Sequence, residues 1–235
     1  MRNEFTNNMI YTDVANPDYN VKITNVSLWL PHIKLNPEAQ AKYQKFALNP
    51  DLNQTIEWTA PRLRESNALN DINGTVHVKT TTDEIISIYV IPQYLDRENT
   101  ADKNNMVFDH LDLTRCYIRV NDTMFPMLDN GVSFKEGGLD DVRYYSDFVS
   151  AVGNTNNTES GFLVSYKEYR KLYPIIYFDV SNHPPYINAK NLNIEFTWHL
   201  RNNPRKPYKF YFILNEKRSG KMNMYNRKFE SLPTL

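Results

Sequence analysis

The sequence predicts an all-β protein, a jelly-roll β-sandwich with short helices in the connecting loops. About eight short segments alternate apolar and polar residues or are continuously apolar, and polar turn residues separate them. Helical patterns are few and lie in the connections, which favours a sandwich over a sheet of βαβ units. The chain also holds 16 Tyr and 12 Phe but only seven Gly, a composition that suits β-sheet and large contact surfaces.

The first half of the chain contains four predicted strands. They are residues 21–30, 54–60, 74–81 and 84–95. In the first, the apolar alternation is interrupted at Asn25–Val26, which predicts a bulge. The last is almost continuously apolar, as expected of a central strand that is buried on both faces.

The second half contains four more predicted strands. They are residues 111–122, 173–181, 191–200 and 208–216. The first of these ends at Asn121-Asp122, a pair typical of turns. Together with the first half, these strands are enough for the two sheets of a jelly roll. Between them lie four long excursions that we expect to face neighbours or the outside: 61–74, 96–107, 126–138 and 154–164.

The first helix is predicted directly after the strand-like segment 21–30. Asn36 can cap it, Pro37 suits the first helical position, and Glu38 lies near the positive end of the helix dipole. The residues expected on its apolar face are Ala39, Tyr43, Phe46 and Ala47. We expect this face to pack beside a sheet.

Two further helices are predicted in the second half. Residues 139–153 place Leu139, Val142, Phe148 with Val149, and Val152 at helical spacing, and Gly153 is expected to end the helix. Residues 165–172 begin with Ser165 and Glu168, which have the spacing of a capping box. The sequence shows no internal repeat and no linker that would divide it into two domains.

The residue types of catalysis and metal binding are present without the spacing that such sites need. The five histidines are scattered: His32, His77, His110, His183 and His199. None forms a His-x-His pair followed by Glu or a zinc spacing, and the Asp109, His110 and Asp112 group has no nucleophile context beside it. The prediction is therefore no enzyme, with no catalytic, cofactor-binding or metal residue and no cofactor.

The charge balance indicates which binding partners to expect, and the cysteine content indicates the compartment in which the protein folds. Lys plus Arg and Asp plus Glu both number 27, so no global charge attracts nucleic acid or an anionic membrane. Residues 201–228 are locally basic, with Glu216 as their only acidic residue. The single Cys116 cannot form an internal disulfide, and no signal peptide or membrane-spanning run is expected, which favours an intracellular folding compartment.

Several segments, taken in order, resemble the double-jelly-roll, hexon-like major capsid protein of polinton- and adintovirus-type elements. They are "YNVKITNVSLWLPHIKLNPEAQAKY", "FDHLDLTRCYIRVNDTMFPM", "DVRYYSDFVSAVGN", "VSYKEYRKLYPIIYFDVS" and "LNIEFTWHLRNNPRKPYKFYFILNE". These look like parts of the second, C-terminal jelly roll of that family. The resemblance spans roughly residues 10–229, and its motifs are loose but ordered.

The resemblance implies a structural virion protein. Residues 1–235 would form a single jelly-roll domain that trimerises into pseudo-hexagonal capsomers of an icosahedral shell. The implied partners are further copies, neighbouring capsomers and penton or minor capsid proteins, without specific nucleic-acid recognition or a membrane span. The protein would be a virion component assembled inside the host cell, in cytoplasm or nucleus, and not secreted.

One departure from the family and one alternative function follow from the same residues. The family's chain has two jelly rolls, and a second one would need about 200 more residues. Met1 could accordingly be an internal methionine, a fragment boundary or the start of a shortened or repurposed descendant. The alternative is a carbohydrate- or ligand-binding β-sandwich, with Trp29, Trp58 or Trp198 as a stacking platform and core packing favoured for Trp58.

Overall fold

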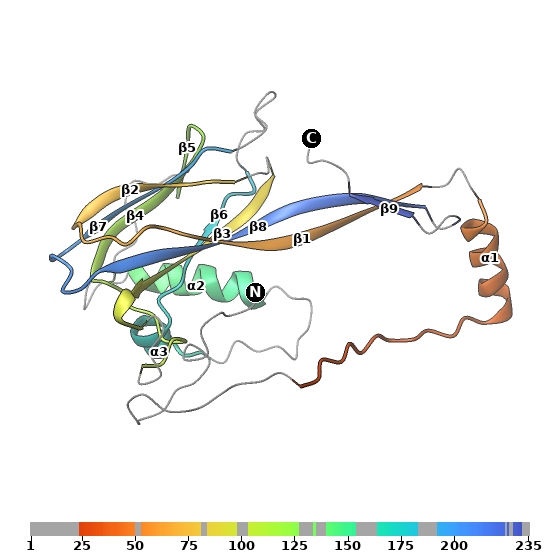
Figure 1. Ribbon diagram of the computed structural model, residues 1–235, viewed down its shortest axis with the longest axis horizontal. Helices are drawn as coiled ribbons and strands as arrows, with labels where there is room; N and C mark the ends of the chain where they lie inside the picture. The colour runs from red at the N-terminus through yellow and green to blue at the C-terminus, as the bar shows by residue number, and fades with distance from the viewer. Residues whose placement is uncertain are drawn as a thin grey trace. The chain divides into compact units, whose positions relative to one another are not determined.

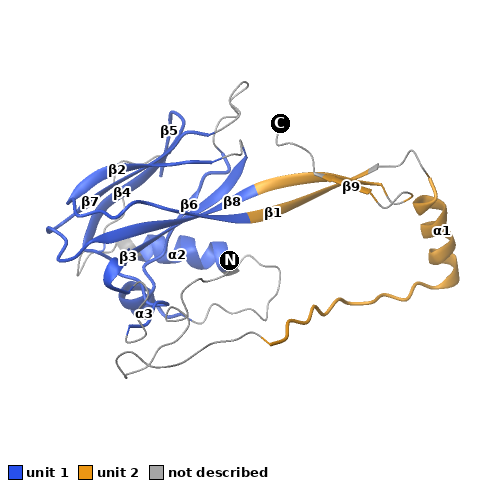
Figure 2. Ribbon diagram, in the orientation of Figure 1, with its two compact units in different colours: residues 1–19, 61–216 blue, residues 20–60, 217–235 orange. Residues whose placement is uncertain are grey.

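A computed structural model describes most of the chain. The described residues are 24–49, 53–80, 84–97, 103–126, 134, 140–153, 164–182, 192–223, 225 and 228–231. They fall into two compact units, coloured separately in Figure 2. The first unit comprises residues 1–19 and 61–216, and the second comprises residues 20–60 and 217–235. Two strands, β1 and β8, have residues in both units.

The strands form two sheets, which Figure 1 shows as layers. One sheet has the order β1-β8-β3-β6, and β9 also pairs with β8. Its strands are β1 (Asn53–Glu65), β8 (Tyr208–Asn223), β3 (Ile85–Tyr94), β6 (Ile176–Asp179) and β9 (Lys228–Ser231). The other sheet has the order β2-β7-β4-β5. Its strands are β2 (Asn73–Val78), β7 (Ile194–Leu200), β4 (Leu113–Val120) and β5 (Thr123–Phe125).

The strand order is that of a hairpin wrapped into a sandwich. The first strand pairs with the eighth, the second with the seventh, the third with the sixth and the fourth with the fifth. The inner three pairings are antiparallel, with Val76 opposite Phe196 and Ile118 opposite Phe125 as examples of the register. This succession places consecutive pairs alternately in the two sheets, which is the arrangement of a jelly roll. The predicted fold class is confirmed.

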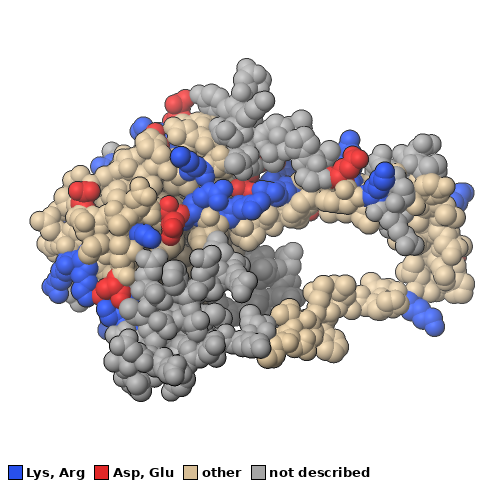
Figure 3. All heavy atoms as spheres, in the orientation of Figure 1, with Lys and Arg blue, Asp and Glu red and all other residues tan. Residues whose placement is uncertain are grey.

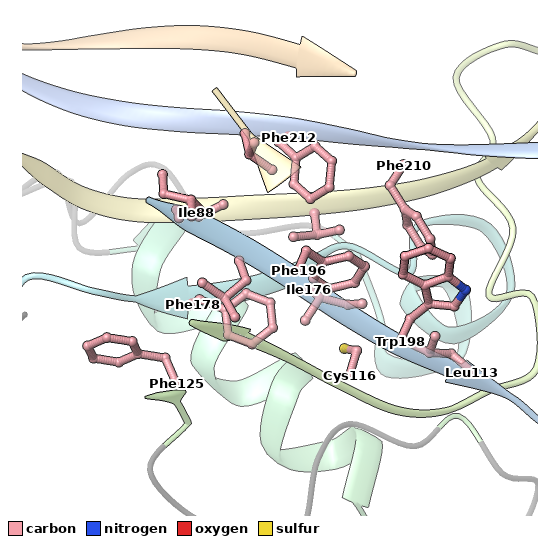
Figure 4. Close-up of a cluster of buried hydrophobic side chains, with 14 of the residues drawn as sticks. Ile88, Leu113, Cys116, Phe125, Ile176, Phe178, Phe196, Trp198, Phe210 and Phe212 are labelled. Carbon is pink, nitrogen blue, oxygen red and sulfur yellow. The ribbon is translucent and has the colours of Figure 1, made fainter. Parts of the chain in front are cut away.

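The core between the sheets is built from alternate residues of β7 and β8. Phe196 and Trp198 on β7 face Phe210 and Phe212 on β8, and all four are at most 3% exposed. Phe196 meets Phe210 edge-on, with ring centroids 4.8 Å apart. Figure 4 shows these rings pointing toward one another, beside the thiol of Cys116. Period-two burial along both strands therefore closes the sandwich.

Two helices lie on the sheet that contains β3 and β6. They are α2 (Asp140–Gly153) and α3 (Tyr166–Leu172). Phe148 on α2 meets Tyr89 of β3 edge-on at 6.2 Å and lies 5.7 Å from the ring of Tyr169 on α3. Strand β3 is consequently covered on both faces, as the continuous apolar run predicted. Ser165 and Glu168 form the predicted capping box of α3.

The buried face of α2 differs from the prediction. Phe148 is buried as predicted, but Val142 and Val152 are exposed, and Tyr144, which was not predicted, is buried. Gly153 is the last residue of the helix, as predicted, and Leu139 lies outside the described residues. The predicted apolar face omitted Tyr144 because tyrosine has a polar hydroxyl. Its ring nevertheless packs like an apolar group.

The second unit contains α1 (Pro37–Ala47), the first residues of β1, the last residues of β8, and β9. The predicted cap is confirmed, since Asn36 accepts a hydrogen bond from the backbone N–H of Ala39 at 2.7 Å and Pro37 begins the helix. The packing prediction for this helix is wrong, because none of its residues is buried.

The predicted strand at 21–30 is also wrong wherever the structure describes it. Residues 24–30 form neither helix nor strand and are exposed, so the bulge expected at Asn25–Val26 does not arise, and residues 21–23 lie outside the described part. Apolar alternation makes a strand possible, but residues 24–30 pair with none of the described strands.

Several boundaries also differ from the predictions. Strand β1 extends to Glu65, so the first part of the 61–74 excursion lies in a sheet, and β8 extends to Asn223. The short strands β5 and β9 and the 3-10 turn η2 (Leu95–Arg97) were not predicted. Most of the excursions 126–138 and 154–164 lies outside the described residues.

Candidate functional site

The histidines have local roles at the surface. His77 lies 3.7 Å from the carboxylate of Glu195, and the ring of His199 lies 3.0 Å from the hydroxyl of Thr114. His32 is exposed in the segment before α1, and His183 lies outside the described residues. Across the described ranges, no group of three or more His, Cys, Asp or Glu side chains is arranged to hold a metal ion.

The Asp109-His110-Asp112 group is a structural turn. Arg97 donates two hydrogen bonds of 3.1 Å to the two carboxylate oxygens of Asp109, and the backbone N–H of Tyr94 donates a third. The bonds to Asp109 raise the pKa of Arg97 above its ordinary value. His110 instead accepts a hydrogen bond from the backbone N–H of Asp112 at 3.0 Å. Asp109 therefore anchors the turn after β3 and does not orient a catalytic histidine.

The tryptophans have three different environments. Trp198 is in the core, where its indole N–H donates to the hydroxyl of Tyr208 at 2.8 Å. Trp58 is half-buried, with its ring 5.8 Å from that of Phe229. Trp29 is 91% exposed. Burial removes Trp198 from any sugar-stacking role. Trp58, for which core packing was predicted, is only partly buried.

The hydroxyl of Tyr208 links Trp198 to the backbone. It accepts from Trp198 and donates to the carbonyl oxygen of Asp71. Burial of the ring raises the pKa of Tyr208 to about 12, and the indole bond opposes this only in part. The phenol therefore stays protonated at neutral pH and can keep both bonds.

The basic segment 201–228 is partly neutralised by acidic side chains. Lys209 lies 3.7 Å from Glu65, and Lys217 lies 3.6 Å from Glu57. The one acidic residue of the segment, Glu216, is fully buried at 3.5 Å from Arg62. Figure 3 shows Lys and Arg interspersed with Asp and Glu on the face in view. Acidic side chains among the basic ones lower the positive potential of the segment, so it is a weaker binding surface for a polyanion.

A second neutralising cluster lies around Asp96. Lys103 donates to its carboxylate at 2.8 Å, and Lys206 donates to the same oxygen. Burial opposes ionisation of this carboxyl, but the bonds from both lysines hold the pKa of Asp96 below its ordinary value. Lys206 therefore has an acidic partner within the first unit.

Most of the exposed large apolar side chains in the described part of the chain lie in residues 24–48, which we call the apolar arm. Nine of its large apolar side chains are exposed. They are Val26, Leu28, Trp29, Leu30, Ile33, Leu35, Tyr43, Phe46 and Leu48. Contiguous exposed apolar surface of this kind marks an interaction site in a soluble protein.

Strand β1 presents a free edge in the described part of the chain. It stands at the end of its sheet, with β8 as its neighbour. Its 13 residues make it long for an edge strand, and Pro61 lies within it. Unpaired backbone groups along such an edge can accept a strand from another chain. The candidate functional site is therefore a pair of contact surfaces, the apolar arm and the outer edge of β1.

Within the described residues, no helix has the length and apolar character needed to cross a membrane.

Comparison with known proteins gives fold-level likenesses. No protein-family model and no curated protein matches the sequence. A chain in the 3.5 Å cryo-EM structure of the Sputnik virophage is similar over 79% of this chain and 39% of its own, with a TM-score of 0.43 and 11% identity. The mavirus major capsid protein is similar over 79% of this chain and 42% of its own, with a TM-score of 0.38 and 12% identity. The chain thus spans about two fifths of the length of these proteins.

Proposed function

We propose that this protein is a structural, major-capsid-type subunit that associates into trimeric, pseudo-hexagonal capsomers of an icosahedral shell. The observation that carries the proposal is the pairing of the eight strands, first with eighth through fourth with fifth. This jelly-roll order is used by viral capsid domains and also by lectins. The ordered sequence resemblance to double-jelly-roll capsid proteins favours the first of these.

The described surface fits a protein that works through contacts. A shell subunit needs wide interfaces rich in aromatic side chains, and many modest contacts gain strength when they close together. Exposed Trp29 and the free edge of β1 are contact features of this kind. We extend the proposal to residues 1–235 as one jelly-roll domain of a capsomer. Its partners would be neighbouring capsomers and penton or minor capsid proteins, in a virion assembled within the host cell.

Sedimentation velocity and light scattering of the purified chain test the proposal. A trimer has three times the 27.7 kDa mass of one chain, about 83 kDa. Electron microscopy of the same sample should show pseudo-hexagonal particles or tiles. A chain that remains monomeric at high concentration, or a stable oligomer of another stoichiometry, contradicts the trimeric capsomer.

A lectin-like role has one observation in its favour, a groove on the outer face of β2, β7 and β4. Arg115 stands over the ring of Tyr117 at 5.7 Å, and the hydroxyls of Thr75 and Thr197 are 3.0 Å apart beside them. An aromatic ring with flanking polar groups can bind a sugar. Glycan-array binding that is lost in Tyr117→Ala would favour this alternative over the capsid role, and a blank array would contradict it.

A further inference from the structure

We infer that the apolar arm, residues 24–48, binds a second copy of this chain. Residues 24–30 would add as a strand to the free edge of the neighbour's β1. The remaining apolar side chains would cover the half-exposed rings beside that strand. The inference rests on the proposed function, because it names the surface through which subunits associate.

The arm exposes more apolar surface than a stable monomer needs. Val26, Leu28 and Ile33 are 80% or more exposed, and Trp29 is 91% exposed. Weighted by their exposed fractions, the nine large side chains amount to on the order of 1,000 Å² of accessible surface. Covering it would bury a similar area on the acceptor, or about 2,000 Å² in total, which reaches the size of a specific protein–protein interface.

The arm is surplus to the fold of the domain. The eight strands between Asn53 and Asn223 complete the jelly-roll pairing without it. Nevertheless, Val26, Leu28 and Leu30 alternate as in a strand with one buried face. A strand pattern that its own sandwich does not use indicates a sheet in another molecule.

Pro31 divides the arm into two apolar faces. Before it Val26, Leu28 and Leu30 occupy even positions and Trp29 lies on the opposite side, and after it Ile33 and Leu35 occupy odd positions. The proline also lacks a backbone N–H, so strand pairing would be interrupted there. The segment that can pair is therefore 24–30, about 23 Å long at 3.3 Å per residue.

The acceptor surface lies on the second unit's part of β1. Its outer edge is open in the described structure, and residues 53–60 offer a length that matches segment 24–30. Ile56 and Trp58 alternate on one face as half-buried residues, and Phe229 of β9, 51% exposed, packs against Trp58. The edge supplies backbone hydrogen bonds, and these side chains supply apolar contacts.

A second copy is the occupant that these features favour. Within one chain the arm is exposed, so its own β1 does not cover it. Lys34 is the only formally charged residue in segment 24–36, so little repulsion opposes the approach of an identical chain. An arm passed from each copy to the next is a heterologous contact, which closes into a ring when the rotation allows. A ring of three agrees with the proposed capsomer.

Charge substitutions on the two sides of the arm test the inference in the full chain. Leu28→Asp with Leu30→Asp places two carboxylates on the apolar side, whereas Asn25→Asp with Ser27→Asp adds the same charge on the other side. Burying carboxylates without partners is costly, so the first pair should weaken self-association at least 100-fold while the control stays within about fivefold of wild type. Equal effects of the two pairs overturn the inference. At low protein concentration, where the chains are separate, the unfolding midpoint should be the same in all three proteins, because the arm has no buried residue in the single chain.

Cysteine cross-linking identifies the acceptor. Native Cys116 is buried, so introduced cysteines can be oxidised selectively. A chain with Ser27→Cys is mixed with differently tagged chains carrying Thr55→Cys, Glu57→Cys or Thr59→Cys on β1. A mixed disulfide with at least one β1 position supports the inference. A cross-link that forms only within one chain carrying both cysteines, or no cross-link at any position, overturns it.

The two proposals fail separately. If the wild-type chain forms a trimer that the Leu28 and Leu30 substitutions leave intact, the arm inference is wrong and the capsomer stands. If it forms arm-dependent dimers and no trimer, the arm inference stands and the trimeric capsomer is wrong. A wild-type chain that is monomeric at every concentration overturns both.

Discussion

The apolar arm and the strands of the sandwich have similar sequence patterns and opposite environments. In β7, Ile194, Phe196 and Trp198 alternate with polar residues, and all three are buried. In the arm, Val26 and Leu28 alternate in the same way, and both are more than 80% exposed. Alternation shows which side of a strand could be buried. Whether it is buried depends on whether a sheet with a free edge is within reach.

Aromatic residues have different roles in the sandwich and in the second unit. Rings in the sandwich contact other rings on facing strands, as Phe196 does with Phe210. In the second unit, Trp29 is exposed and Phe229 is half-exposed, so their apolar surface is available to another molecule. The first unit's rings stabilise the fold, and those of the second unit can stabilise an assembly.

The largest expected contrast is between Phe196→Ala and Leu28→Ala. Removing a fully buried phenyl ring leaves a cavity, so Phe196→Ala should lower the free energy of unfolding by about 3–5 kcal/mol. Leu28→Ala removes an exposed side chain and should change it by less than about 0.5 kcal/mol. Urea denaturation at low protein concentration, where chains are separate, measures both. Similar losses for the two variants would contradict the contrast.

Most of the sandwich could be predicted because its local patterns agree with its tertiary partners. The segment 84–95 is continuously apolar, and β3 is covered by a sheet on one face and by helices on the other. Asn121-Asp122 forms the turn between β4 and β5, with Asn121 at a φ of 52° that asparagine tolerates. Asn36 and Ser165 cap their helices through side-chain bonds that the sequence alone specifies.

The contact surface could be predicted only in part, because it depends on what remains uncovered after folding. Sequence reasoning placed segment 21–30 in the sheet, since its pattern equals that of a paired strand. It placed the Tyr43 and Phe46 face of α1 against a sheet for the same reason, whereas both side chains are more than 40% exposed. The strand count could not separate them, because the eight predicted strands included segment 21–30, whereas the structure completes its eight with β5, a three-residue strand that was not predicted.

Adding one methyl group to a glycine in each unit should give the second largest contrast. A Cβ on Gly74 would stand 2.8 Å from the ring of Trp198, which is held by core packing, so Gly74→Ala should destabilise by about 1–3 kcal/mol. A Cβ on Gly220 would meet the end of the Phe229 ring, which is half-exposed and can turn away, and would stand 3.1 Å from the backbone oxygen of Glu230, a tight contact that a small shift relieves. Gly220→Ala should therefore cost about 1 kcal/mol or less in a denaturant titration. A larger cost at Gly220 would show that Phe229 or the backbone at Glu230 cannot move aside.

Alkaline pH should weaken the sandwich through Tyr208. Its pKa is about 12 in the folded chain, against an ordinary value near 10, so the folded state holds the phenolic proton more tightly. This stability is fully present below pH 10 and is lost as the pH rises toward 12. Tyr208→Phe leaves the indole N–H of Trp198 without its acceptor and should cost about 1–3 kcal/mol at neutral pH.

The pH dependence separates the Tyr208 hydroxyl from the other tyrosines. Tyr89 and Tyr177 also have raised pKa values through burial, so every variant should lose some stability in alkali. The wild type should lose more between pH 10 and 12 than Tyr208→Phe, and the two denaturation midpoints should converge. Parallel pH profiles would show that Tyr208 does not titrate with folding.

The smallest contrast concerns the two helix caps, and it tests whether α1 belongs to the cooperative fold at all. Ser165 caps α3, whose Tyr169 is fully buried, so Ser165→Ala should lower the free energy of global unfolding by about 1 kcal/mol. Asn36 caps α1, which buries nothing, so Asn36→Ala should leave global unfolding unchanged and speed hydrogen exchange of the α1 amides alone. If α1 gains its packing only from another copy, this exchange should slow as protein concentration rises, and Asn36→Ala should then weaken association. Protection of α1 that is independent of concentration would place the helix within the fold of the single chain.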